Sequence, residues 1–182
     1  MSALSTANFA NELLAKFKSP PARSNRFLVD ITLPTAFGAT NIPNLICMST
    51  SLPGYNFDAV EINQGKALTR KIVNGATFSP ISLTFILTED YDLKKTFDDW
   101  QKLILNTDQP GNDFKYIGFY SDYIGAVAVS QTSYSDPKKV IYQANFLEAY
   151  PISVGPVSLD MGNNGATILP VAFQYYDFEI IT

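Results

Sequence analysis

The residue types that usually carry out catalysis are scarce in this chain. It has no histidine and a single cysteine, Cys47, among 182 residues. Without histidine, neither a Ser-His-Asp nor a Cys-His arrangement can be assembled, and histidine-based metal sites are excluded as well. Cys47 lies in an apolar run, where a buried and inert thiol is expected instead of a nucleophile. The sequence therefore predicts no catalytic residues and no enzymatic activity.

Two short segments resemble ligand-binding loops, but both lack residues that those loops need. The segment from Asp160 to Gly165 resembles the start of an EF-hand loop, yet Val171 stands where the bidentate glutamate belongs. Lys66 follows Gly65 as in a phosphate-binding loop, but the first glycine of that motif is absent. We therefore expect a plain turn at the first segment, and neither a bound metal ion nor a cofactor.

The composition is typical of a folded protein and does not indicate a nucleic-acid-binding surface. Hydrophobic residues make up 46% of the chain and charged residues 16%, which suggests that partners cover part of its surface. The net charge is −4, whereas phosphate binding requires an excess of lysine and arginine on one face. The apolar stretches fall far short of the roughly 20 residues that span a bilayer. We expect no stable membrane insertion.

The first element to expect is a short amphipathic helix. Phe9, Leu13 and Phe17 recur at helical spacing, and Pro20 ends the pattern. Residues 1–20 are therefore predicted to form a helical arm. The arm either docks on a neighbouring subunit through Phe9 and Leu13 or packs on the core of its own chain.

From residue 26 onward, apolar and polar residues alternate as in half-buried β-strands. Asn74-Gly75 predicts a tight hairpin turn at the end of an extended, mostly polar stretch. About seven strands and one good helix indicate a mainly β fold, a β-barrel or sandwich built from residues 21–182. The expected strands cover residues 27–33, 45–51, 81–87, 124–131, 139–147, 157–160 and 167–180, with an interruption at Pro170.

One strong helix is predicted in the middle of the chain. Leu93, Phe97, Trp100 and Ile104 follow one another at spacings of four, three and four residues, so they form one apolar stripe. Acidic residues just before this stripe suit the positive end of the helix dipole. We expect Phe97 and Trp100, together with Phe85 from the preceding strand, to be core residues that hold the helix against the sheet.

Three stretches, taken in order, resemble the tail tube protein family of contractile-tailed bacteriophages. They are PARSNRF (21–27), then LPG (52–54) continuing through RKI (70–72) to FDDW (97–100), and finally AYPISVG (149–155) followed by LD (159–160) and YY (175–176). Together they span about residues 20 to 179. The chain departs from the family pattern at residues 112–125. This segment is longer and more aromatic than the family pattern predicts, and we expect it to form an addition to a loop.

The resemblance implies a subunit that closes into homo-hexameric rings, which stack into the inner tube of a contractile tail. Its partners would be further copies of itself, the surrounding sheath protein, and the baseplate and tail terminator proteins. DNA would pass through the tube without specific binding, which agrees with an acidic chain. The subunit would belong to the virion after assembly in the host bacterial cytoplasm. The tube protein of type VI secretion systems shares this plan.

Stacking of rings needs an extension that leaves the plane of the ring. We expect this extension in the polar hairpin region 54–75, with the 1–20 arm as the second candidate. The same stretch can instead be an ordinary surface β-arm. The candidate contact residues are Gly54, Val60, Ile62, Gly65, Leu68 and Arg70, besides Phe9 and Leu13.

Two other functions stay open on the sequence alone. Within the same fold, the chain can be the baseplate-proximal initiator of the tube, present in few copies. From a different class, it can be a monomeric β-sandwich that binds glycans through its tyrosine-rich segment 114–123. An enzyme ranks last, since no base with a near-neutral pKa is visible.

Overall fold

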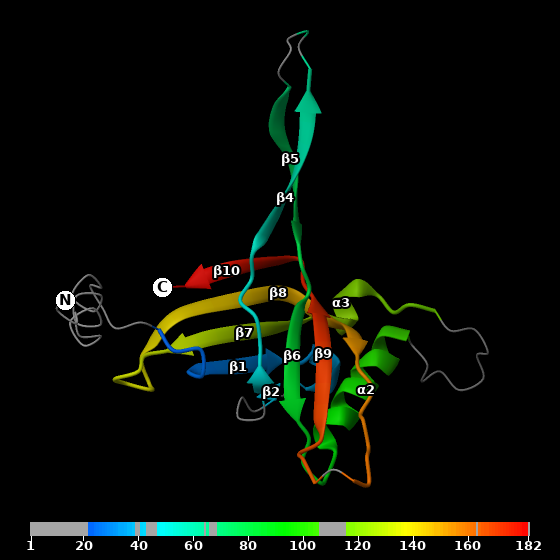
Figure 1. Ribbon diagram of the computed structural model, residues 1–182. Helices are drawn as coiled ribbons and strands as arrows, with labels where there is room; N and C mark the ends of the chain where they lie inside the picture. The colour runs from blue at the N-terminus through cyan, green and yellow to red at the C-terminus, as the bar shows by residue number, and fades with distance from the viewer. Residues whose placement is uncertain are drawn as a thin grey trace, which may run out of the picture.

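The computed structural model describes residues 22–38, 41–42, 47–63, 65, 69–105, 116–162 and 164–181. The predicted helical arm at 1–20 lies outside these ranges. The mainly β fold is confirmed: a curled sheet forms a half-barrel, a helix covers one side of it, and a hairpin projects from it (Figure 1).

All paired strands of the sheet are antiparallel, in the order β2-β1-β7-β8-β9-β6-β3, and β10 pairs with β8 beside this path. Figure 1 shows that β6 and β9 run across the direction of β1, β7, β8 and β10. The strands are β1 (Phe27–Thr32), β2 (Asn41–Ile42), β3 (Cys47–Ser49), β6 (Ile81–Ile86), β7 (Gly125–Thr132), β8 (Val140–Val154), β9 (Ile168–Gln174) and β10 (Asp177–Ile181), and the helical elements are η1 (Thr35–Phe37), α2 (Asp92–Leu105) and α3 (Tyr120–Tyr123).

Strand β8 joins the two halves of the sheet because it bends within its length. Its first part pairs with β7 and β10, and its last residues pair with β9. One extra residue lies on β8 between Phe146 and Ala149, and Glu148 in this bulge has a φ of 52°. A bulge bends the strand that carries it and increases its twist. The curl of the half-barrel therefore has its origin in this short segment.

The predicted end of this strand near residue 147 is wrong, because β8 continues through Tyr150-Pro151. Proline cannot donate a ladder hydrogen bond and is tolerated in sheets mainly at edges and bulges. Pro151 meets this condition: it pairs with Phe173, and the register shifts between Pro151 and Ser153. In the same way Pro170 lies inside β9 opposite Thr84. The break that we expected at Pro170 lies instead between β9 and β10.

The core lies between the curled sheet and α2. Leu93, Phe97 and Trp100 of the predicted stripe are buried, and the Phe97 ring lies 5.6 Å from Phe85 and 5.9 Å from Phe173. The sheet contributes Val29, Ile31, Leu83, Phe85, Val127, Val129, Ala144, Phe146, Val171 and Phe173. The stripe at the 3.6-residue period is thus sufficient to orient the helix on the sheet.

The hairpin consists of β4 (Tyr55–Ile62) and β5 (Arg70–Phe78), and its turn is not at Asn74-Gly75. Asp58 pairs with Gly75 and Ala59 pairs with Val73, so Asn74 is the extra residue of a bulge inside β5. The prediction was wrong because residues that suit a tight turn also suit a bulge. The strand predicted at 157–160 is absent, and these residues form an irregular loop. The described residues contain more strands than the seven that we expected.

Candidate assembly surfaces

The base of the hairpin is fixed to the body by aromatic side chains. Tyr55 lies 4.8 Å from Phe178, and Phe78 lies 5.6 Å from Tyr175, measured between ring centroids. The Tyr175 hydroxyl donates a hydrogen bond to the carbonyl of Ser79 at 3.1 Å, and burial raises the pKa of this phenol. Both hairpin strands therefore leave the body from one rigid cluster.

The outer part of the hairpin has two faces, which the strand register defines. Val60 lies directly opposite Ile72, and Ile62 lies directly opposite Arg70, so these four residues share one face. The other face carries Ala59 opposite Val73 and an ion pair of 3.2 Å between Glu61 and Lys71. Apolar groups are thus present on both faces.

This hairpin buries almost nothing within its own chain. Every residue of β4 is exposed, including Phe57 with 63% of its surface accessible, and Val73 in β5 is 60% accessible. An isolated two-stranded hairpin is marginally stable in water, because it lacks a second layer to cover its apolar side chains. Within the described ranges, these large apolar side chains are left uncovered and available for contact with another molecule.

Most of the predicted contact residues lie on or beside this hairpin. Gly54 precedes β4, and Gly65 lies in the turn region with a φ of 73°, a conformation that favours glycine. Val60, Ile62 and Arg70 lie together on the face described above. Their role in contacts between subunits stays a prediction. Leu68, Phe9 and Leu13 lie outside the described residues.

In the described ranges, β2, β3 and β10 each have one open edge, and the edges of β3 and β10 lie at different borders of the sheet. Among the described residues, β10 pairs only with β8, and β3 pairs only with β6. Ile180 and Ile181 on β10 are about half exposed. An open strand edge presents unpaired N–H and C=O groups, and pairing with another strand satisfies them. Both borders are therefore suited to contacts with further chains.

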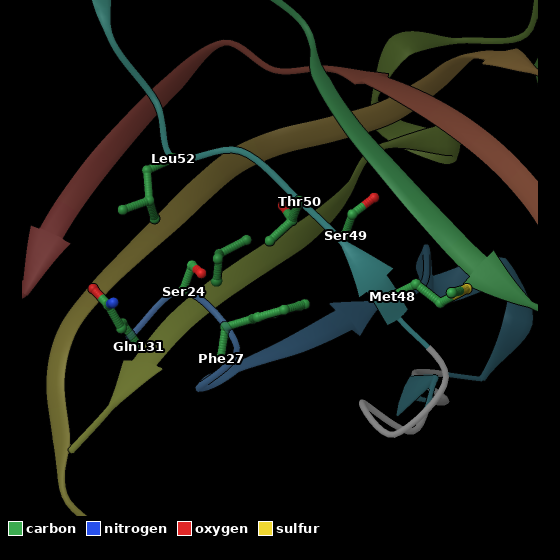
Figure 2. A pocket seen from close by; sticks show the side chains of 8 residues that line it. Ser24, Phe27, Met48, Ser49, Thr50, Leu52 and Gln131 are labelled. Atoms are coloured by element: carbon green, nitrogen blue, oxygen red, sulfur yellow. The ribbon is translucent and has the colours of Figure 1, made fainter. Parts of the chain in front are cut away.

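A groove lies on the open side of the half-barrel, between β3 and the strands β1 and β7 (Figure 2). It has a volume of about 380 Å³, with an apolar wall of Phe27, Met48, Leu52 and Val129. Its polar members are Ser24, Ser49, Thr50 and Gln131. None of these lining residues is ionisable near neutral pH, so the groove can accept an apolar side chain but offers no acid or base.

Two observations concern metal binding and thiol chemistry in the described residues. No group of three or more histidine, cysteine, aspartate or glutamate side chains within them is placed to hold a metal ion. Burial raises the pKa of the Cys47 thiol, so it stays protonated at neutral pH and is a poor nucleophile. In these ranges no helix combines the length and the apolar composition needed to cross a bilayer.

The described part of the tyrosine-rich segment forms an aromatic cluster. The rings of Tyr120 and Tyr123 lie 5.5 Å apart, and each packs edge to face against Tyr150 on β8. Burial and a hydrogen bond to Glu148 raise the pKa of Tyr120 to about 12. Each of these three rings thus packs against the other two.

A further exposed apolar surface was missed by the sequence reasoning. In the loop between β8 and β9, Leu159 is 77% exposed and Met161 is fully exposed, while Asp160 accepts the Gly162 N–H at 2.9 Å. The sequence reasoning predicted a short strand at 157–160, which is an irregular loop in the structure. The available signal was the turn itself, since apolar residues on either side of an aspartate turn have no core to face.

A family model described as phage tail tube protein matches residues 22–181 of this chain. No curated protein sequence matches it. Similar solved structures include a chain of the anti-feeding prophage tube terminating cap, with 18% identity, 91% of this chain and 94% of that chain covered, and a TM-score of 0.67.

Two further solved structures resemble the chain over most of its length. A chain of the sheath-tube complex of the PVC extracellular contractile injection system, in the extended state, has 17% identity and a TM-score of 0.63 over 98% of this chain and 99% of that chain. A chain of the anti-feeding prophage baseplate, 6-fold symmetrised, has 16% identity and a TM-score of 0.65 over 90% of this chain and 97% of that chain. At these identities the likeness concerns the fold.

Proposed function

This chain belongs to the phage tail tube protein family, and from this premise we propose that it forms hexameric rings that stack into the inner tube of a contractile tail. Membership makes it a structural component of the virion tail. The finer assignments proposed are the six-fold ring, a sheath around the tube, contacts with baseplate and terminator proteins at its ends, and passage of DNA through its bore.

The free-standing hairpin is the observation that carries this proposal. A monomer gains nothing from exposing Phe57 and Val73, whereas a stacked ring buries them against a neighbour. We propose that region 54–75 is the stacking extension, with Val60, Ile62 and Arg70 among its contact residues. The arm at 1–20, with Phe9 and Leu13, is the second proposed contact.

The open borders of the sheet support closure into a ring. Because β10 and β3 lie at different borders, the edge of one copy can meet the other border of the next copy head to tail. Closure of the ring then pairs the β10 and β3 edges of every copy. Six-fold closure is consistent with the 6-fold symmetrised baseplate that contains a chain of the same fold.

The proposed role as a conduit for DNA rests on the negative net charge of the chain. A net charge of −4 disfavours tight binding to DNA phosphates, so a nucleic acid can slide through a lumen of such subunits. The prediction is that the assembled tube shows no measurable retention of double-stranded DNA at physiological salt.

Deletion of the tip between Ile62 and Leu68 tests the stacking role. We expect the full chain to form long hollow tubes in negative-stain electron microscopy, and the deletion variant to stay folded by circular dichroism without forming tubes. Long tubes from the deletion variant would rule out the hairpin as the stacking element. A full chain that forms only one or two layers of rings would instead favour the baseplate-proximal initiator of the same fold.

A further inference from the structure

A second exposed apolar surface lies at the opposite end of β6 from the hairpin. Strand β5 leads into Ile81, the first residue of β6, while β6 ends at Ile86. Leu87 then donates its N–H to the carbonyl of Thr167 at 2.9 Å, which joins the β6–α2 turn to the β8–β9 loop. Figure 1 shows the hairpin at the top of the molecule and these two segments at the bottom. We call the described residues of 88–92 and 157–168 the foot.

The foot contains a hollow whose lining is partly apolar and partly polar. The hollow has a volume of about 300 Å³; Leu159, Ala166 and Ile168 are its apolar side chains, and Ser158, Asp160 and Thr167 are its polar ones. Leu159 and Met161 stand out from the loop with almost no cover from their own chain. Side chains of this kind at an exposed position indicate a contact surface, and the hollow has room for one or two aliphatic side chains.

The rim of the foot is acidic. Glu89 and Asp90 are exposed in the β6–α2 turn, and Asp160 is exposed in the loop. The neighbouring basic group is Lys95, which donates to the Asp90 carbonyl at 2.8 Å and pairs with Asp92 at 3.2 Å. One lysine against four carboxylates leaves this end of the molecule negatively charged at neutral pH.

The hairpin carries the complementary pattern. Val60, Ile72 and Ile62 form an apolar stripe on one face, and Arg70 extends this face at its outer end. Within residues 59–73 the sequence has one acidic residue and three basic ones. An apolar stripe beside a guanidinium thus lies at one end of the molecule, and the exposed apolar side chains of Leu159 and Met161 lie beside carboxylates at the other.

We propose that the hairpin of one copy docks on the foot of the next copy along the tube, with Val60 and Ile72 against Leu159 and Met161, and Arg70 beside Asp160. This inference rests on the proposed stacking function and names the surface that receives the hairpin. The contact is heterologous, because each copy offers one hairpin and one foot at opposite ends. Such a contact repeats without closing, so growth continues along one axis.

Two variants that each lack one partner surface test the docking. Val60→Ser/Ile72→Ser keeps the foot, and Leu159→Ser/Met161→Ser keeps the hairpin. Each variant alone is expected to form rings without tubes. Preformed rings of the two variants, when mixed, are expected to give discrete pairs of rings, because only one productive hairpin–foot contact is possible. Tubes formed by Leu159→Ser/Met161→Ser alone, or no ring pairs in the mixture, would overturn the proposal.

A charge reversal with a matched control tests the polar part of the contact. Asp160 and Asp136 are both exposed and both accept a backbone N–H two residues on, at 2.9 and 3.0 Å. We expect Asp160→Lys to abolish tubes, Asp136→Lys to keep them, and Arg70→Glu combined with Asp160→Lys to restore them. Equal loss in both aspartate variants, or no loss in Asp160→Lys, would contradict the assignment.

These outcomes are separable from those of the proposed function. If the unmodified chain forms neither rings nor tubes, the proposed function itself fails. If it forms tubes and every foot variant does so equally well, the hairpin still stacks the rings but the foot is not its acceptor.

Discussion

Replacing Trp100 by alanine is expected to destabilise the subunit more than any change on its surface. The indole is completely buried, lies 5.9 Å from the Phe173 ring, and donates its N–H to the carbonyl of Tyr123 at 2.7 Å. Trp100 therefore connects α2 both to the sheet and to the segment that enters β7. Its removal leaves a cavity and also an unpaired carbonyl group.

The two contributions can be estimated separately. Truncation of a buried Trp or Phe to alanine costs about 3–5 kcal/mol, because lost transfer energy and a residual cavity add together. Trp100→Phe keeps part of the apolar contact but removes some ring volume together with the donor to Tyr123, and the unpaired carbonyl alone costs about 1–3 kcal/mol. A domain of this size has about 5–15 kcal/mol of total stability. Trp100→Ala is therefore expected to remove a large share of it.

Urea denaturation followed by far-ultraviolet circular dichroism measures both effects. The hairpin-tip deletion variant is the suitable background, because it is expected not to polymerise during the measurement. The expected order of unfolding free energy is unmodified, then Trp100→Phe, then Trp100→Ala. A loss below about 1 kcal/mol in Trp100→Ala would refute the packing of α2 described here.

Three further predictions concern the core, alkaline pH and the hairpin. Gly125→Ala is expected to lower the free energy of unfolding in urea by about 1–3 kcal/mol, because the added Cβ would overlap the Thr32 carbonyl and lie 3.0 Å from Trp100 Cη2. An unchanged midpoint of urea denaturation would contradict this close approach. The pKa of Tyr120 is raised from 10.0 to about 12 in the fold, so folding favours the neutral phenol. Tyr120 therefore contributes its full stabilisation below pH 10, and this contribution is lost as pH rises towards 12. Tyr120→Phe should therefore reduce the alkaline loss of stability in thermal melts between pH 9 and 12, and an identical pH profile would refute this. Val60→Ser/Ile72→Ser should lower the unfolding free energy by less than about 1 kcal/mol while abolishing tubes, since Val60 is 48% and Ile72 is 42% exposed in the single subunit. A large drop in stability would show that the hairpin packs on its own chain.

The sequence was informative wherever one residue pattern had one structural meaning. The stripe from Leu93 to Ile104 predicted both the helix and its buried face, and alternation at 27–33 and 81–87 predicted the strands β1 and β6. The motifs around these elements predicted the family, which the family model confirms. In each case a period of 3.6 or 2 residues sets which side chains meet the core.

The sequence failed where the same residues serve two purposes. Asn74-Gly75 suits a turn or a bulge, and only the pairing of Asp58 with Gly75 shows that it is a bulge. Proline often ends a strand, but Pro151 lies beside a register shift in β8, and Pro170 lies within the continuous pairing of β9 with β6. The foot was missed because it depends on which loops meet, and that contact is a long-range property of the β6–β9 pairing.

The central claim is that this subunit completes its exposed surfaces with further copies of itself. Cryo-electron microscopy of the concentrated, purified full chain tests this claim most directly. We predict hollow tubes of stacked six-membered rings, with the β4–β5 hairpin of each subunit crossing into the adjacent ring. A uniform population of single chains at high concentration, with the hairpin folded against its own sheet, would contradict it.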